Sequence, residues 1–405
     1  MKILLLTQYF PPEFGAAAAR NAEHARLWAE AGHDVEVLTG FPNYPEGVIH
    51  PEYKGKRFLK TEQDGYRLHR TWLHAAPNRS VFQRAAASLS FMASALLSGC
   101  LRCQRPDVIV ASSGPFFVGP LGYLLSLFKR APFVFEARDL LPQQAVDTGM
   151  LKNPILIRLL STIEKFLDHR AAAIITVAPA SRDALIERGI PPCKVHTIEN
   201  GVNEAFFKPG PRGNALRDQH GWGEKFVALY AGAHGVSQGL GALLEAASAL
   251  KGEADILFVF VGDGAAKPEL MATAKEQRLD NVQFLPPLSK ENMPDLYNAA
   301  DVCLVPLRKG NYFEINIPSK LFEIMACGRP IVLGAKGQAR ALLEAPGAGI
   351  AVDPEDAAAY AEAIRRLRDE GEAAAQFGKG GRAHVTEHFT RAKKARAYLE
   401  ILERL

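Results

Sequence analysis

Short apolar runs alternate with amphipathic helical stretches along almost the whole chain, and this alternation constrains the fold most strongly. A brief apolar run suits a buried strand, and a helical stretch between two such strands is the usual crossover of a parallel sheet. The pattern predicts an α/β protein with parallel sheets and helices on both faces. The predicted strands are residues 3–6, 35–38, 108–110, 133–135, 174–177, 195–198, 227–230, 257–261, 282–284, 302–305 and 331–333, and the clearest helices are residues 16–31, 154–170, 240–250 and 319–327.

The alternation breaks once, in a turn-rich segment near the middle of the chain. Asn200-Gly201 is followed by Pro209-Gly210-Pro211, and such residues mark turns and linkers. We therefore predict two doubly wound, Rossmann-like domains that face each other across a cleft, a division that suits a chain of 405 residues. The predicted boundaries are residues 1–199 for the N-terminal domain, 200–213 for the linker, 214–385 for the C-terminal domain and 386–405 for a C-terminal helix that packs back on the first domain.

Composition and charge narrow the class of protein. An apolar content of 48% and a charged content of 23% are typical of a globular protein. The opening MKILLL is too short for a signal peptide and is interpreted as the first strand. The apolar stretch over residues 85–101 is rich in Ala and Ser and flanked by arginines, which favours a packed or surface helix, so we predict no transmembrane segment.

The five cysteines are scattered, and only Cys100 and Cys103 form a CxxC pair. No second pair or His pattern accompanies them, so we interpret them as buried thiols in a reducing cytosol, with zinc or redox chemistry as the less favoured alternative.

The segment over residues 298–335 carries the clearest sign of chemistry. An apolar strand runs through a polar loop into a helix that opens at Ser319, and a second strand follows. Helix N–H groups and the helix dipole bind phosphate at such a place, and Lys320 adds a cation. Glu323, one turn further on, is spaced to chelate two neighbouring hydroxyls of a ribose. Phosphate beside a diol indicates a nucleotide; the alternative is an ordinary βαβ unit with a surface lysine and glutamate.

Other loops of the second half follow predicted strands and contain glycine or proline, and they strengthen the prediction of a nucleotide site. Ligands of doubly wound sheets bind beyond the carboxyl ends of the strands. The residues that we assign to this donor side are Gly232, Gly235, Asp263 and Pro286.

In the first half, Gly15 precedes a helix and could approach a diphosphate closely, whereas Arg20 could face either the cleft or solvent. Arg138 and Asp139 follow a buried strand, where clustered charges are often functional. Pro42, Asn43 and Tyr44 lie in a loop that could shape an acceptor pocket. The chain contains no Asp-x-Asp, so we predict no metal and no cofactor, and cations such as Lys320 would neutralise a leaving diphosphate.

Several strings resemble the retaining glycosyltransferases of family four, which have the two-domain GT-B fold. They are QYFPPEFG, AEAGHDVEVLTGFPNYPEG, PFVFEARDLLP, IENGVNEAFFKP, LYAGAHGVSQGLGALLEAA and IPSKLFEIMACGRPIV, and the resemblance extends over essentially the whole chain. It is strongest to the WbuB-like branch, which builds O-antigen, capsule and exopolysaccharide.

The resemblance implies transfer from a nucleotide sugar with retention, the nucleotide lying on the second domain and the acceptor mainly on the first. It places Glu323 at the ribose, the backbone amides of Asn316 and Ile317 near the phosphate or donor sugar, and Gly15 at the diphosphate. We add Ser319 to the donor-binding residues and take Lys320 as the first choice of catalytic cation, with Arg138 as the second. Two features depart from the family pattern. Glu314 stands one position out of step with the first glutamate of the usual pair, and Ala233 and Gln238 replace an Arg and a Lys.

On this basis we expect a cytoplasmic enzyme, peripherally associated with the inner face of the cell membrane. It would move an N-acetylated or deoxy hexose from UDP to an undecaprenyl-diphosphate-linked acceptor of lipopolysaccharide or exopolysaccharide. Residues 54–105, with ten basic residues against Glu62 and Asp64, would attract the anionic membrane; a solvated basic face is the alternative. A UDP-sugar 2-epimerase and a non-catalytic nucleotide-sugar sensor are the rival functions. Nucleic-acid binding fits poorly, because aromatic residues do not interleave with the basic ones.

Overall fold

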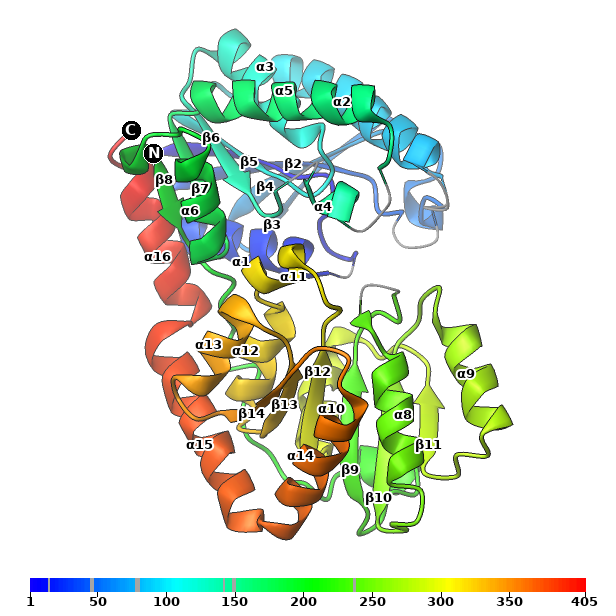
Figure 1. The fold of residues 1–405 in the computed structure, drawn as a ribbon. Coiled ribbons are helices and arrows are strands. Elements are labelled where there is room, and N and C mark those ends of the chain that lie inside the picture. Colours follow the sequence, from blue (N-terminus) through cyan, green and yellow to red (C-terminus); the bar gives the residue numbers. More distant parts are fainter. Residues whose placement is uncertain (14, 44–46, 77–80, 141–142, 148–150, 236–237) are drawn as a thin grey trace. The chain divides into compact units, whose positions relative to one another are not determined.

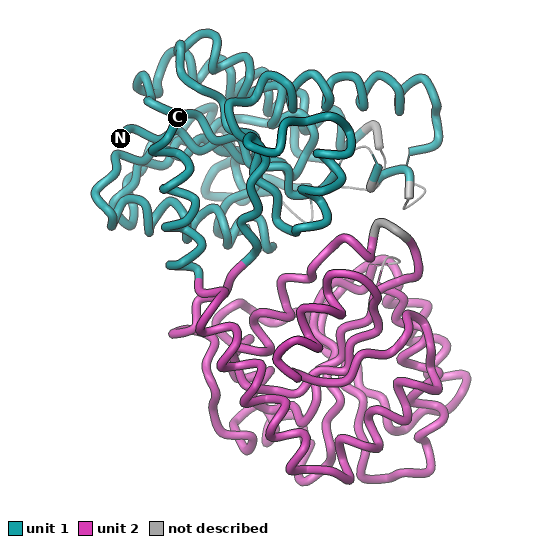
Figure 2. Tube along the Cα trace, turned by 60° about the vertical axis from the view of Figure 1, so that its left-hand side comes forward, with its two compact units in different colours: residues 1–200, 391–405 teal, residues 201–390 magenta. Residues whose placement is uncertain are grey.

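The chain forms two compact units in a computed structural model that describes residues 1–13, 15–43, 47–76, 81–140, 143–147, 151–235 and 238–405. Unit 1 contains residues 1–200 and 391–405, and unit 2 contains residues 201–390 (Figure 2). The chain therefore passes from one unit to the other twice, and each unit has its own sheet.

The sheet of unit 1 has the strand order β3-β4-β2-β1-β5-β6-β7-β8. Helices α2, α3 and α5 cover one face, and α1, α6 and α16 lie on the other (Figure 1). The strands are β1 (Lys2–Leu6), β2 (Asp34–Gly40), β3 (Phe58–Gln63), β4 (Tyr66–Thr71), β5 (Val108–Ser112), β6 (Phe133–Ala137), β7 (Ala173–Thr176) and β8 (Val195–Thr197). The helices are α1 (Ala16–Glu30), α2 (Val81–Arg102), α3 (Val118–Lys129), α4 (Gln143–Asp147), α5 (Pro154–Arg170), α6 (Pro179–Glu187) and α16 (Arg391–Leu402).

The sheet of unit 2 has the order β11-β10-β9-β12-β13-β14, and its described strand pairs are all parallel. Alternate residues of β9 enter different cores: Val227 and Leu229 face one, and Ala228 and Tyr230 face the other. The strands are β9 (Phe226–Ala231), β10 (Ile256–Val261), β11 (Val282–Leu285), β12 (Val302–Pro306), β13 (Ile331–Gly334) and β14 (Gly349–Val352). The helices are α7 (Ala215–Gln219), α8 (Gly241–Ala249), α9 (Lys267–Glu276), α10 (Met293–Ala299), α11 (Asn311–Ile315), α12 (Ser319–Ala326), α13 (Gly337–Glu344), α14 (Ala357–Asp369) and α15 (Gly371–His388).

The predicted doubly wound α/β class is confirmed, and all eleven predicted strands are present. Three strands were missed, namely β3, β4 and β14. The expectation of wholly parallel sheets was wrong for unit 1, because β3 pairs antiparallel with β4. This hairpin closes through Asp64 and Gly65, both with positive φ, so the Asp-Gly pair was the available signal.

The division of the chain differs in detail from the predicted boundaries. Residues 201–213 belong to unit 2, where Val202 and Phe207 enter the core, so this segment is not a free linker. Residues 386–390 also belong to unit 2. Helix α16 packs on α1 of unit 1, where Trp28 Nε1 donates to the carbonyl of Ala395 at 3.1 Å.

One helical stretch of the described chain, Gln83–Arg102 in α2, is long and apolar enough to cross a membrane, with a mean hydropathy of 1.3. About a third of this window is buried, and α2 packs against α3, β2 and β4. Length and composition alone therefore do not distinguish a spanning helix from the packed or surface helix that the sequence predicted.

Candidate functional site

The order of the strands marks one edge of each sheet as a candidate site. In unit 2, the connections leave β9 and β12 in opposite directions, which creates a switch point at the carboxyl ends of these neighbouring strands. The same arrangement occurs at β1 and β5 in unit 1. The predicted donor-side residues of unit 2 follow the strands at this edge or lie at the beginning of α12.

Helix α12 begins at Ser319 after the switch-point strand β12, with Pro318 as the extended N-cap residue. Pro318 itself makes no side-chain capping hydrogen bond. The first-turn N–H groups and the positive end of the helix dipole are oriented to attract an anion.

Lys320 reaches from α12 to the end of β9. Its Nζ lies 4.4 Å from the centre of the Tyr230 ring, a cation–π contact. Within the described chain it has no carboxylate ion-pair partner. Burial lowers the pKa of Lys320 to about 8, an effect that the Glu323 carboxylate opposes, so the side chain is mostly charged at pH 7. Lys320 thus supplies an uncompensated cation at the beginning of the helix.

The loops after β9 and β10 pack against each other through Gly232 and Gly262. A Cβ atom on Gly232 would lie 2.6 Å from Lys320 Nζ, and one on Gly262 would lie 1.9 Å from the Gly232 carbonyl oxygen. Both residues have a positive φ near 140°, so a side chain is disfavoured by conformation at both positions, and at Gly262 the Gly232 backbone also leaves no space for one. Lys267 Nζ donates to the carbonyls of Gly262 and Leu285, at 2.6 and 2.9 Å, and so joins the ends of β10 and β11.

His234 supports the same loop from beneath. It is fully buried, and its ring lies edge-on to Tyr230 with centroids 5.6 Å apart. Burial, with help from the charge of Lys267, lowers the pKa of His234 to about 4. The imidazole is therefore neutral at pH 7, and we assign it to packing.

Glu323 is held one turn further along α12. Its Oε2 accepts a hydrogen bond from the hydroxyl of the buried Tyr297 at 3.2 Å. An ionised carboxylate has about four lone-pair sites on its two oxygens, so it can accept hydrogen bonds from a diol as well as from Tyr297. The structure thus places Lys320 and Glu323 on the same helix, at the predicted spacing.

The other predicted donor-side residues of unit 2 differ in how far they are exposed. Asp263 and Pro286 are exposed at the ends of β10 and β11, and Asp263 Oδ1 accepts from the Gly264 N–H at 2.8 Å. Gly235 is partly buried after β9. Asn316 and Ile317 connect α11 to α12, and Ile317 packs on the core.

Glu314 lies on α11, is exposed, and lines an open hollow with Lys309 and Lys336. The structure does not bring it into contact with Lys320. Among the described residues, the three-membered group of His, Cys, Asp or Glu that could hold a metal lies elsewhere, in unit 1.

In unit 1, a buried charge cluster lies at the end of β6. Arg20 Nε donates to Glu136 Oε1 at 3.1 Å, and the same oxygen accepts from Ser112 Oγ at 3.2 Å and Arg138 at 3.5 Å. Burial raises the pKa of Glu136, but the guanidinium groups of Arg20 and Arg138 outweigh it and hold the pKa below its ordinary value. Arg20 is fully buried, so the alternative that it faces solvent was wrong. It also donates to the carbonyls of residues 198 and 199, so it fixes the chain after β8 to α1.

Arg138 and Asp139 lie where they were predicted, directly after β6. Arg138 is 8% exposed, and its backbone N–H donates to Ser113 Oγ at 3.0 Å. Asp139 is partly exposed and lines a water-sized cavity with Glu164 of α5. Burial, reinforced by Asp168, raises the pKa of Glu164 to about 8.

The predicted acceptor loop is packed more tightly than we expected. Glu13 Oε1 accepts from the Asn43 N–H at 2.9 Å, and Glu13 Oε2 accepts from the Phe10 N–H at 3.2 Å, which joins the loops after β1 and β2. Pro42 and Asn43 are buried, whereas Tyr44 lies outside the described residues. Gly15 is exposed at the beginning of α1 with φ 140°, and a Cβ there would contact nothing within 4 Å. Among the described residues, nothing would therefore obstruct a ligand that approaches Gly15.

Sequence reasoning missed the residues that hold the predicted ones in place. Tyr230 lies against Lys320, and Tyr297 donates a hydrogen bond to Glu323. Lys267 donates to the carbonyl of Gly262 and so holds the glycine loops. Their signal was weak, because a tyrosine in an apolar strand or helix is usually core.

Comparisons with known proteins match both halves of the chain to glycosyltransferases. A family model described as "Glycosyl transferases group 1" matches residues 225–370, and a "Glycosyl transferase 4-like domain" model matches residues 15–201. The chain is 29% identical over 378 residues to WcaI of Escherichia coli (strain K12), which is described as a colanic acid biosynthesis glycosyl transferase; the match covers 90% of this chain and 92% of that one. It is also 29% identical over 384 residues to D-inositol 3-phosphate glycosyltransferase 1 of Catenulispora acidiphila, covering 89% and 84% of the two chains.

Solved structures share the whole fold at low identity. Anabaena HepE in complex with UDP and glucose matches with a TM-score of 0.76 and 20% identity, over 100% of both chains. WaaG, a glycosyltransferase involved in lipopolysaccharide biosynthesis, matches with a TM-score of 0.69 and 16% identity, over 99% of both chains. At these identities the likeness shows the fold, which is GT-B.

Proposed function

Because the chain is a glycosyltransferase of group 1 with the GT-B fold, we propose that it uses a UDP-linked hexose as donor and a lipid-linked saccharide as acceptor, with retention of anomeric configuration. The preferred donor would be an N-acetylated or deoxy hexose. The product would be an intermediate of bacterial surface polysaccharide. The likeness to WcaI over nine-tenths of the chain supports a polysaccharide role.

One observation carries the donor half of this proposal. Lys320, without an ion-pair partner among the described residues, and Glu323, tied to Tyr297, lie one turn apart at the beginning of α12, beside the switch-point strands. In the proposal, the diphosphate lies at the helix N-terminus against Lys320 and near Gly232, and Glu323 chelates the ribose. Asp263, Pro286 and the segment containing Asn316 and Ile317 would complete the pocket.

The proposed reaction is a front-face displacement. The bond between the sugar C1 and the phosphate oxygen breaks, UDP leaves with the electron pair, and the acceptor oxygen forms the new bond to C1 on the same face. The acceptor proton passes to the departing phosphate oxygen, so the step needs no metal and no cofactor. Lys320 and the α12 dipole stabilise the leaving charge, and Arg138 and Asp139 orient the acceptor; such effects contribute several kcal/mol each.

The acceptor half of the proposal rests on an apolar and basic surface of unit 1. Helices α2, α3 and α5 lie together on one face of the sheet (Figure 1), and they expose large apolar side chains: Leu97 and Leu101 on α2, Leu127 and Phe128 on α3, and Ile155 and Leu159 on α5. These three helices contain only two acidic residues, Glu164 and Asp168, and both are buried. Their exposed charges are therefore basic, which suits an anionic bilayer.

This surface differs from the one expected over residues 54–105. Part of that region forms the β3–β4 hairpin, Phe91 of α2 is fully buried, and α3 and α5 contribute apolar residues outside it. We propose that the α2–α3–α5 surface holds the enzyme at the cytoplasmic face of the inner membrane, where a polyprenyl-diphosphate-linked acceptor would be found.

Two measurements test the donor and acceptor. The purified enzyme, incubated with a panel of UDP-sugars and a lipid extract containing diphosphate-linked saccharides, should release UDP and give a longer lipid-linked saccharide. NMR of the product should show the donor's anomeric configuration. An inverted product would contradict retention. Epimerisation of the UDP-sugar without acceptor would overturn the transferase function in favour of the epimerase.

Flotation with vesicles tests the membrane surface. An Ile155→Glu/Leu159→Glu variant should lose most binding to vesicles rich in phosphatidylglycerol, because it places two charges where apolar side chains would enter the interface. Met271→Glu, at an exposed apolar residue of α9 in unit 2, is the control for adding an acidic side chain elsewhere and should bind normally. Equal binding by both variants would contradict this surface.

A further inference from the structure

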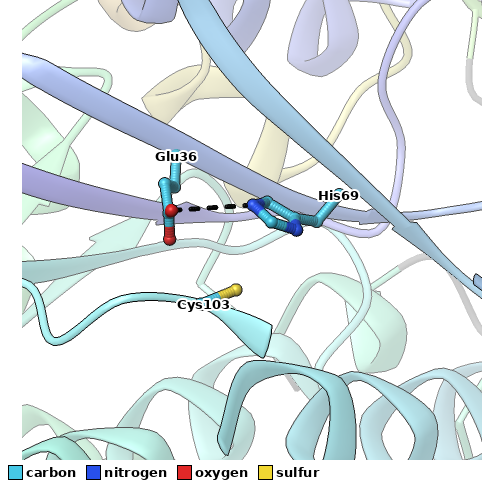
Figure 3. A group of neighbouring side chains, drawn as sticks. All are labelled: Glu36, His69 and Cys103. Carbon is cyan, nitrogen blue, oxygen red and sulfur yellow. Dashed lines mark ion pairs between the residues drawn. The ribbon is translucent and has the colours of Figure 1, made fainter. Parts of the chain in front are cut away.

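A group of three metal-ligating side chains lies in unit 1, within the sheet and away from the strand ends considered above. Glu36 comes from the middle of β2, His69 from β4, and Cys103 from the residue directly after α2 (Figure 3). Their ligand atoms all lie within 4.8 Å of one another, and all three residues are buried. The glycosyl-transfer reaction does not use any of them.

His69 is the residue that needs an explanation. It is 1% exposed, and neither ring nitrogen has a hydrogen-bond partner among the described residues. Its Nε2 forms an ion pair with Glu36 Oε1 at 3.7 Å, a distance that is too long for a hydrogen bond (Figure 3). An unsatisfied buried polar group costs about 1 to 3 kcal/mol. Two ligands of one tetrahedral zinc ion, with bonds of about 2.0 to 2.3 Å, stand roughly 3.3 to 3.7 Å apart, so the gap suits a shared ion.

The surrounding charges also suit a divalent cation. Arg67 donates to Glu36 Oε1 at 3.0 Å and to Asp34 Oδ1 at 2.5 Å, and it would orient the ligating carboxylate from outside. The two positive charges of a zinc ion and the one of Arg67 would balance the three negative charges of the Cys103 thiolate, Glu36 and Asp34. The group would therefore have no net charge. Lys129, which donates to the carbonyls of Cys100 and Cys103, remains partly solvated beside it.

We propose that Glu36, His69 and Cys103 form a zinc site with three protein ligands. Carboxylate, imidazole and thiolate are all zinc ligands, and a water molecule would complete a tetrahedron. The ion would bind the end of α2 to the β2–β4 edge of the sheet and so fix one border of the α2–α3–α5 surface. The partner of Cys103 is thus the Glu36–His69 pair, and Cys100 of the CxxC lies outside the site.

Metal content of matched variants tests the proposal. Untagged full-length protein, loaded with one equivalent of Zn²⁺ and gel-filtered, should retain about one zinc per chain. Cys103→Ala and His69→Gln should each retain less than a tenth, while Cys100→Ala and Cys193→Ala, which alter cysteines outside the group, should match the wild type. Zinc should raise the Tm of the wild type by about 5 to 10 °C at a hundredfold excess over Kd, and leave that of Cys103→Ala unchanged.

A second readout does not depend on the folding of any variant. Co²⁺ added to the wild-type protein should give a thiolate-to-cobalt charge-transfer band and the intense visible bands of a four-coordinate site, and Zn²⁺ should abolish both. A wild-type protein that takes up less than a tenth of an equivalent, a cobalt spectrum without the thiolate band, or full zinc retention by Cys103→Ala would overturn the site. None of these outcomes affects the proposed transferase reaction.

Discussion

Replacing Lys320 by methionine should weaken UDP binding strongly. A unit charge about 4 Å from a phosphate oxygen contributes up to about 4 kcal/mol at an effective dielectric of about 20. Lys320 is only partly buried, so solvent screening reduces this, and we expect a loss of about 2 to 3 kcal/mol. The Kd for UDP should therefore rise about 30- to 150-fold. Methionine keeps an unbranched stem against the Tyr230 ring, so packing changes little.

Isothermal titration calorimetry with UDP measures the effect directly. Lys275→Met is the matched control, because Lys275 is exposed on α9 and the substitution removes the same charge from the same unit. Its Kd should stay within twofold of the wild type. Circular dichroism and Tm establish that each variant is folded. A folded Lys320→Met protein that binds UDP within threefold of the wild type, or an equal loss in Lys275→Met, would refute a diphosphate site at the beginning of α12.

Three further predictions follow from the ionisable groups of the two units. Because the pKa of Lys320 is lowered to about 8 and UDP requires its charged form, UDP affinity measured by calorimetry should fall as pH rises from about 7 to about 8.5, and this fall should be absent from Lys320→Met; a wild-type affinity that is unchanged at pH 8.5 would contradict this. Glu323→Gln should weaken UDP about tenfold but leave pyrophosphate binding unchanged, since the carboxylate addresses the ribose; equal losses for both ligands would contradict that role. Because burial and Asp168 raise the pKa of Glu164 to about 8, the folded state favours the neutral acid, and its free energy of unfolding should fall by about 1.4 kcal/mol per pH unit between about pH 5 and 8. Denaturant unfolding should then show Glu164→Gln to be more stable than the wild type at pH 8 and nearly equal to it at pH 5, and the same stability difference at both values would contradict the raised pKa.

The core of the fold was predictable because parallel strands are buried on both faces. Runs such as residues 257–261 and 302–305 are apolar throughout and were correctly assigned as strands. Two of the three missed strands have the opposite character, whereas β14, with the sequence GIAV, is a short apolar run that we did not assign. Edge strand β3 is largely exposed, and β4 alternates polar and apolar residues, so neither forms an apolar run. Propensity and run length find buried strands better than edge strands.

The candidate site was predictable where chemistry depends on backbone geometry. A helix that begins after a switch-point strand, followed by Lys320 and Glu323, is visible in the order of residues. The burial of Arg20 could not be predicted, because its partner Glu136 is 116 residues away in the sequence. Only the pairing of β5 with β6 and the packing of α1 bring the two residues together. The apolar surface on α3 and α5 was missed for a related reason, since sequence does not show which face of an amphipathic helix stays uncovered.

The position of α16 has a consequence for the order in which the molecule assembles during synthesis. Trp28 and His24 of α1 lie against Tyr398, a residue that leaves the ribosome some 370 residues after them, roughly half a minute at about 5 to 20 residues per second. Unit 2 is continuous in the chain and can complete its core during translation. Unit 1 must wait with an apolar flank of α1 uncovered, so removal of residues 391–405 should trap nascent chains as aggregates or chaperone clients while unit 2 is already native.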